Sequence, residues 1–416
     1  MGLPMAILLE LVLTRGMGQT QYGYYSAGLS WLMVLGMASS MGTNQVLMRF
    51  LPLYGTRHQH GKAQGLIRWS AKFCLWVGAL TGAGLAAVAG ISSIWSEGPL
   101  PQVLLIMAVW VPLHGFCIRR QGALQGLRHP VLAMLPELLL RPVLVILLVT
   151  IVHFLLRQDL TAVWGAVLFG LALALSMAVG QWAWRFYLKQ EIPGCKPEPD
   201  LKVWRKTAFP LWWMTLMHLA LIRADPAMLA WLSGPDEAAL FAVASRGADL
   251  LVFGLTAISA IAAPVFSQYH AQGKTPELQK MLNLSTLGLA AFSLPVAGVL
   301  YLLGPWLLNF FGAGFEDAYG PLCFLLLGQC ITALAGPLAF LLTMTGHHAL
   351  AARLLTFCAA GKLLLNFVFM PKFGAIGGAA ATAAMLLCWN LVLARETRRS
   401  VGLTPSLLYW LPRKHA

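Results

Sequence analysis

Long apolar runs separated by short polar breaks extend along the whole chain. In hydrocarbon a helix satisfies its own backbone polar groups, so apolar runs of about 18 or more residues predict membrane-spanning helices. Twelve such segments lie near residues 2–14, 24–51, 69–91, 103–118, 131–155, 161–187, 207–232, 238–263, 282–303, 319–343, 350–369 and 375–394. The pattern therefore predicts an all-α membrane protein with about twelve transmembrane helices.

The apolar pattern is interrupted near its middle by one long polar connection, residues 189–206. This connection predicts an N-terminal six-helix lobe (1–188), a C-terminal six-helix lobe (207–396) and a basic tail (397–416). Parallel six-helix repeats with a binding site between them are a known transporter plan.

A faint internal repeat agrees with the two lobes. Pro52 precedes Gly61-Lys62 by the same spacing as Pro264 precedes Gly273-Lys274. The repeat is short, and it supports the division into lobes without establishing it.

Composition and charge fit this placement. Hydrophobic residues make up 58% of the 416 residues and charged ones only 11%, against about 25% in soluble domains. Of the 29 Lys and Arg residues, 21 fall in or beside the loops after even-numbered segments, including Arg119 and Arg120 after the fourth, and 3 fall on the other side. Because short cytoplasmic loops retain basic residues, both termini are predicted to be cytoplasmic. The net charge of +14 is spread over separate loops, which does not favour nucleic-acid binding.

Basic residues within or beside the predicted spans are the first candidates for a binding site. Embedded charges are costly and usually face protein or a water-filled cavity. The cations outnumber the four acids Glu10, Glu137, Asp225 and Asp249, and an excess of arginine suits a phosphate-bearing ligand. The predicted substrate-binding cations are Arg15, Arg49, Arg141, Arg223, Arg246 and Lys362. For Arg49, an alternative is snorkelling to lipid headgroups.

Three embedded acids, Glu137, Asp225 and Asp249, are candidates for ion coupling. Glu137 and Arg141 are four residues apart, and Arg246 and Asp249 are three apart, so each pair can meet on one helix face. Asp225 directly precedes Pro226, which can open the backbone. The alternative is that these charges only ease membrane insertion or hold neighbouring helices together.

Motifs for catalysis are missing from the sequence. The seven cysteines form no CxxC pair, and there is no GxSxG, HExxH or Walker motif. We therefore expect no enzymatic activity, no metal and no cofactor.

Several segments resemble one family of transporters. LTRGMGQTQYGYYSAGLSWLMVLGMASSMGTNQVLMRFLPLY, near the start, is similar to the opening of the polysaccharide transporter, or oligosaccharide flippase (Wzx-like), family of the MATE-like (MOP) superfamily. GPWLLNFFGAGF, LLLGQCITALAGPLAFLLTMTGHH and PKFGAIGGAAATA resemble its ninth to twelfth helices in order and spacing. The first segment is shorter here than the family pattern implies.

The resemblance implies a MATE-like fold whose lobes surround a central cationic cavity. It implies export of undecaprenyl-diphosphate-linked oligosaccharide by alternating access, for cell-surface polysaccharide, across the bacterial cytoplasmic membrane. By position, Arg15 and Arg49 look like family arginines and Asp225 like a family acid. Coupling to H⁺ or Na⁺ and contact with membrane lipids and polysaccharide-assembly proteins are further implications.

Other readings stay open at this point. A multidrug exporter of the same superfamily should have an acidic cavity for cationic drugs. A membrane-embedded polysaccharide polymerase or glycosyltransferase commonly has large extracytoplasmic loops, and here the predicted outer loops are short. A non-transporting scaffold for glycan assembly is a third possibility.

Overall fold

The computed structural model describes residues 2–95, 98–155, 159–191 and 196–404, and these form helices and turns without a strand. The all-α prediction is confirmed. Arg157, Cys195 and most of the predicted basic tail, with Arg413 and Lys414, lie outside the described residues.

The helices up to the middle of the chain are α1 (Gly2–Met17), α2 (Gln19–Ser40), α3 (Thr43–Thr56), α4 (His60–Trp95), α5 (Leu100–Gly126), α6 (Pro130–Leu135), η1 (Pro136–Leu140), α7 (Arg141–Thr150), η2 (Ile151–Leu155), α8 (Ala162–Glu191) and α9 (Leu201–Leu232). They are followed by α10 (Pro235–Ala271), α11 (Thr275–Asn309), η3 (Phe315–Ala318), α12 (Tyr319–Ala335), α13 (Leu338–Met344) and α14 (His348–Ser400).

Lipid is the solvent that these helices require. Eight of the described helical stretches are long and apolar enough to cross a membrane. Large side chains such as Ile94, Trp182, Leu302 and Phe357 are more than 70% exposed, which water would penalise and hydrocarbon does not. The chain is a multi-pass membrane protein. The count of twelve crossings and the cytoplasmic termini stay predictions.

Two predicted spans are interrupted in the structure. Segment 24–51 is divided between α2 and α3, because Met41 and Gly42 both adopt left-handed backbone conformations. Segment 319–343 is divided between α12 and α13 at Gly336 and Pro337. Both breaks contain a glycine, which can take such conformations at little cost.

Contacts divide the chain into two compact units, Met1–Ala230 and Trp231–Ala416. In the first unit, α3, α4, α5 and the start of α9 share one apolar core. Trp204 is fully buried there, and its indole N–H donates a 3.0 Å hydrogen bond to the Tyr54 hydroxyl. Burial raises the pKa of the Tyr54 hydroxyl above its ordinary value, so the group stays uncharged in this core.

The division between the units falls in the last turn of α9, between Ala230 and Trp231, whereas the sequence predicts the lobe boundary before this helix, at 189–206. Residues Leu201–Lys206 of that connection already belong to α9. Trp204 and Trp212, whose indole donates to the Ala38 carbonyl at 3.1 Å, hold the start of α9 to the first unit. The assignment of this helix to the C-terminal lobe stays a prediction.

Each unit contains a turn of the same type, after α3 in the first and after α10 in the second, but the residues that correspond differ from those paired by the sequence repeat. The turn after α3 closes with a bond from the Gln59 amide to the Tyr54 carbonyl at 2.9 Å, and the turn after α10 with one from Lys274 to Tyr269 at 3.0 Å. His58 and Gly273 occupy the equivalent left-handed positions. The residue that corresponds to Gly273 is therefore His58, three residues before the Gly61 that the sequence repeat paired with it, and Gly61 lies inside α4.

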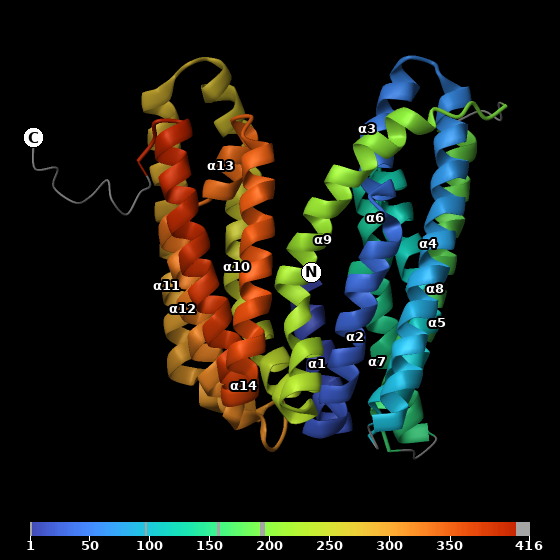
Figure 1. Ribbon diagram of the computed structural model, residues 1–416, viewed down its shortest axis with the longest axis vertical. Helices are drawn as coiled ribbons and strands as arrows, with labels where there is room; N and C mark the ends of the chain where they lie inside the picture. The colour runs from blue at the N-terminus through green and yellow to red at the C-terminus, as the bar shows by residue number, and fades with distance from the viewer. Residues whose placement is uncertain (1, 96–97, 156–158, 192–195, 405–416) are drawn as a thin grey trace, which may run out of the picture. The chain divides into compact units, whose positions relative to one another are not determined.

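In the second unit, α14 is a helical hairpin (orange and red in Figure 1). The backbone leaves helical geometry at Gly374, with φ 56° and ψ −136°. Gly361 faces Met385, and Gly377 faces the Phe369 carbonyl, so the two limbs run antiparallel. These limbs correspond to predicted segments 350–369 and 375–394.

Both helix ends at this turn are capped, one by Ser233 in the turn before α10 and one by Glu237 in the first turn of α10. The Ser233 hydroxyl donates to the Met370 carbonyl at 2.7 Å, and the Glu237 carboxylate accepts from the Ala375 amide at 2.5 Å. A carboxylate at a helix N-terminus satisfies a free amide and suits the helix dipole.

Replacing Gly374 tests this turn. In Gly374→Ala the new Cβ would overlap the Glu237 carboxylate, and alanine is strained at φ 56°. We expect a loss of about 1–3 kcal/mol, seen as a lower thermal unfolding midpoint of the detergent-solubilised protein. Gly298→Ala is the control, because its Cβ would meet open space within α11. Equal midpoints for the two variants would contradict the assigned role of Gly374.

Candidate functional site

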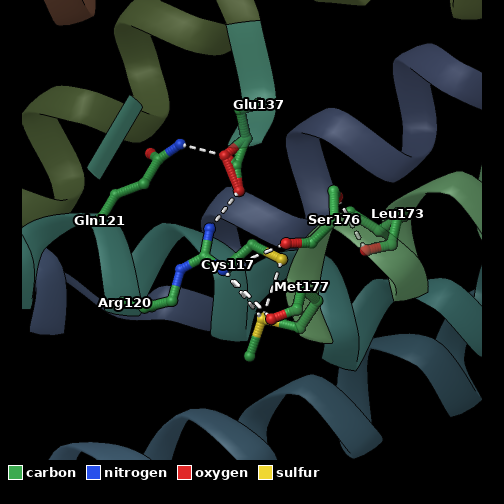
Figure 2. A network of polar contacts seen from close by, with 7 residues as sticks. All are labelled: Cys117, Arg120, Gln121, Glu137, Leu173, Ser176 and Met177. Carbon is green, nitrogen blue, oxygen red and sulfur yellow. Dashed lines mark hydrogen bonds and ion pairs between the residues drawn. The ribbon is translucent and has the colours of Figure 1, made fainter. Parts of the chain in front are cut away.

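A buried ionic network lies inside the first unit, between α5, η1 and α8. Figure 2 shows Arg120 and Gln121 from α5 reaching the Glu137 carboxylate. Arg120 Nη2 lies 2.8 Å from Glu137 Oε1, and Gln121 Nε2 donates to Glu137 Oε2 at 2.7 Å. Arg120 is 0% exposed and Glu137 8%. Both carboxylate oxygens thus have donors in an environment with little water.

The other side of the Arg120 guanidinium faces α8. Its Nη1 donates to the carbonyls of Ser176 and Met177 at 3.5 and 3.3 Å. Gly180 makes this approach possible, since a Cβ there would overlap the guanidinium. Arg120 Nε has no hydrogen-bond partner among the described residues.

Arg119, the next residue, is equally buried but points to α4. It donates from Nε to the Ser70 hydroxyl at 3.0 Å and from Nη2 to the Ile67 carbonyl at 2.8 Å. The predicted placement of Arg119 and Arg120 in a loop is therefore wrong. The helix α5 continues past both arginines to Gly126, and the segment GALQG contains no proline that would have ended it earlier.

Glu137 and Arg141 do not form the predicted pair. Two donors from α5 occupy the carboxylate, and the Arg141 guanidinium lies 5.6 Å from the centre of the Phe169 ring. Arg141 Nη1 is buried without a hydrogen-bond partner among the described residues. His114 on α5 is also buried with an unpartnered Nδ1, and nothing in its sequence context singles it out.

The predicted pair on α10 is present. Arg246 Nη1 lies 3.3 Å from Asp249 Oδ2, and both side chains are partly exposed. The i, i+3 spacing places them on one helix face, as expected.

The remaining predicted residues fall into buried and exposed groups. Asp225, at 1% exposed, and Lys362, at 3%, are buried, as is Asn366 one turn beyond Lys362. Arg223 is half-buried. Each is surrounded mainly by protein, which fits a role inside a unit better than one at the lipid interface.

Arg15 and Arg49 are exposed at the surface of the first unit. The Arg49 guanidinium lies 5.6 Å from the centre of the neighbouring Phe50 ring. The exposed Arg49 guanidinium is placed where it can contact a ligand or a lipid headgroup.

The chemistry that Glu137 can perform is proton or cation exchange. Loss of the negative charge of a carboxylate held by a guanidinium and an amide weakens both contacts, and a buried arginine then lacks its counter-charge. The Arg120–Glu137 pair therefore links the charge of Glu137 to the contacts between α5, η1 and α8.

Breaking this pair should be costly. Glu137→Ala leaves Arg120 buried without a counter-charge, and we expect a loss of about 3–5 kcal/mol. The double variant Arg120→Met with Glu137→Leu removes both charges and should regain most of the loss. Thermal unfolding in detergent measures both effects.

Lys62→Ala serves as the control for this series. Lys62 lies 4.0 Å from Asp200, and both side chains are about one-third exposed, so less than about 1 kcal/mol is expected. If Glu137→Ala lowered the stability no more than Lys62→Ala does, the buried ion pair would not be needed to hold the first unit together.

Comparisons with known proteins address fold and family. A multidrug resistance MATE family transporter of the MOP superfamily, in an inward-facing conformation, is similar with a TM-score of 0.74 and 15% identity, over 99% of this chain and 96% of that one. Its outward-facing counterpart gives a TM-score of 0.61 and 15% identity, over 96% and 93%. The lipid II flippase MurJ, in an inward closed conformation, gives 0.69 and 14%, over 98% and 87%. The fold is therefore MATE-like.

Sequence comparison adds the family. No curated protein sequence matches the chain. A family profile described as "Polysaccharide biosynthesis protein" matches residues 2–270, well over half of it. Together with the all-helical membrane fold, this match identifies the chain as a member of the polysaccharide biosynthesis protein family.

Proposed function

We propose that the protein is a flippase that moves an oligosaccharide linked to undecaprenyl diphosphate across the bacterial cytoplasmic membrane. The observation that carries the proposal is the match to the polysaccharide biosynthesis protein family on a MATE-like fold. The similarity in fold to a lipid II flippase supports a lipid-linked substrate. Cell-surface polysaccharide assembly is the process that such a step serves.

The excess of embedded cations supports a diphosphate-bearing substrate. Guanidinium groups bind phosphate oxygens through paired hydrogen bonds, so arginine is the preferred partner of such ligands. The cations proposed to bind the substrate remain Arg15, Arg49, Arg141, Arg223, Arg246 and Lys362. For Arg141 the supporting observation is that its buried Nη1 has no hydrogen-bond partner among the described residues, which leaves a donor for a ligand.

Transport against a gradient requires an energy source, and H⁺ or Na⁺ is proposed as the coupling ion. Glu137, Asp225 and Asp249 are the candidate coupling residues. Glu137 is the strongest, because neutralising it would remove the counter-charge of the buried Arg120 and weaken the contacts that join α5 to η1. Alternating access requires such a link between ion binding and helix packing.

A multidrug exporter is the second candidate, because a multidrug resistance transporter shares the fold. Such a protein binds cationic drugs, and a cavity rich in arginine would repel them. A polymerase or glycosyltransferase is a candidate of another class, and it would form glycosidic bonds instead of moving its substrate.

A transport assay in proteoliposomes tests the proposal. Fluorescent lipid-linked oligosaccharide should move between leaflets with the purified protein and an imposed ion gradient. Arg223→Ala and Arg246→Ala should each slow this movement at least about tenfold, the usual effect of losing a charge-assisted contact. Arg399→Ala, at an exposed position near the end of α14, is the control and should transport normally.

The outcomes separate the candidates. Normal transport by both Arg223→Ala and Arg246→Ala would remove these residues from the site. Transport of a cationic dye in place of the lipid-linked sugar would favour the multidrug exporter. Growth of the glycan chain during the assay would favour a polymerase.

A further inference from the structure

A cavity of about 300 Å³ lies at one end of the first unit. It is enclosed by the last turn of α3, the first turn of α4 and the turn that follows α5. The residues that line it are Leu51, Pro52, Gly55, Thr56, His60, Ala63, Gly126, Leu127 and Arg128. The network around Glu137 contributes no residue to this lining.

The lining is amphipathic and basic. Leu51, Ala63 and Leu127 supply apolar surface, while Thr56, His60 and Arg128 supply a hydroxyl, an imidazole and a guanidinium. No acidic residue is among the lining residues. Such a surface suits a ligand with a negatively charged group attached to an apolar portion.

The basic residues of the two turns are kept at a conformational cost. Arg128 has φ 64° and His58 has φ 54°, a region that costs about 1–3 kcal/mol for residues other than glycine. The turn at Arg128 closes with a 2.9 Å hydrogen bond from the His129 amide to the Leu124 carbonyl. The turn at Gly346 in the second unit corresponds to it, because it closes with a 2.9 Å bond from the His347 amide to the Leu342 carbonyl. The second unit thus uses glycine, Gly273 and Gly346, where the first unit has a basic side chain.

Arg128 is available for an external anion. Its side chain is exposed, and no carboxylate among the described residues pairs with it. Lys62, by contrast, already lies near Asp200. Arg57 and His58 in the neighbouring turn add positive charge, and the Glu198 carboxylate beside Gly61 is the nearest acid to the lining that the described residues show.

We propose that this cavity binds the phosphate headgroup of an anionic membrane lipid. The charged turns follow apolar helices, so they lie at the depth where lipid headgroups are found. The volume is on the order of ten water molecules, enough for a phosphoglycerol group. Arg128 and His60 contact the phosphate, and Leu51 and Leu127 contact the glycerol and the start of the acyl chains.

Lipid binding to the purified protein tests this site and does not depend on transport. Short-chain phosphatidylglycerol is titrated into the detergent-solubilised protein, and the rise in thermal unfolding midpoint gives the apparent affinity. Arg128→Gly should be at least as stable as the parent without lipid, because it relieves strain, and should bind phosphatidylglycerol at least about tenfold more weakly. Arg128→Asn, which tolerates the same backbone, should behave likewise.

Matched variants and ligands sharpen the result. Arg128→Lys keeps the charge and should retain most of the binding. Arg353→Gln removes an exposed arginine that follows the equivalent turn of the second unit, and should leave binding unchanged. Phosphatidylcholine should stabilise the protein less than phosphatidylglycerol.

Three results would overturn the proposal. Unchanged phosphatidylglycerol affinity in both Arg128→Gly and Arg128→Asn would remove the cavity as the site. Equal stabilisation by phosphatidylcholine would exclude recognition of negative charge. Binding of inorganic phosphate as tightly as phosphatidylglycerol would make a soluble phosphate, and not a lipid, the occupant.

Discussion

A charge placed within a helix bundle in a membrane has to find its partners inside the protein, because hydrocarbon offers none. Arg120 and Glu137 meet this constraint together, and much of the first unit is arranged around them. Gln121 takes the second carboxylate oxygen, two carbonyls of α8 face the guanidinium, and Gly180 leaves the space that it fills. The packing of α5 against η1 and α8 is thus set by an ion pair as well as by apolar contact.

The same constraint explains which parts of the fold could be predicted. Apolar runs placed the twelve segments on helices, with breaks inside two of them, because burial of the backbone in lipid favours helix wherever such a run occurs. The breaks at Gly42 and Gly336 were not predicted, since glycine is common inside membrane helices and its φ depends on the helices around it. The close turn at Gly374 was anticipated only as a gap between two segments.

The site residues were predicted less well, for a related reason. Spacing along one helix found the Arg246–Asp249 pair, whose partners lie on a single face. Spacing also predicted a Glu137–Arg141 pair, but partners from another helix occupy that carboxylate, and contacts between helices are not encoded in local spacing. Arg119 and Arg120 were missed because basic residues near the end of an apolar run look like loop residues until their acceptors on α4 and α8 are known.

The hairpin turn of α14 has a practical consequence for mapping how the chain is threaded through the membrane. Topology is commonly determined by inserting reporter domains into connections between helices. At residues 371–374 an insertion would separate Ser233 from the Met370 carbonyl and Glu237 from the Ala375 amide, so the reporter would describe a disturbed chain. In a variant whose seven native cysteines are replaced, a cysteine at the exposed Lys372 leaves both caps in place, and labelling it from one side of the membrane reports the side on which the turn lies.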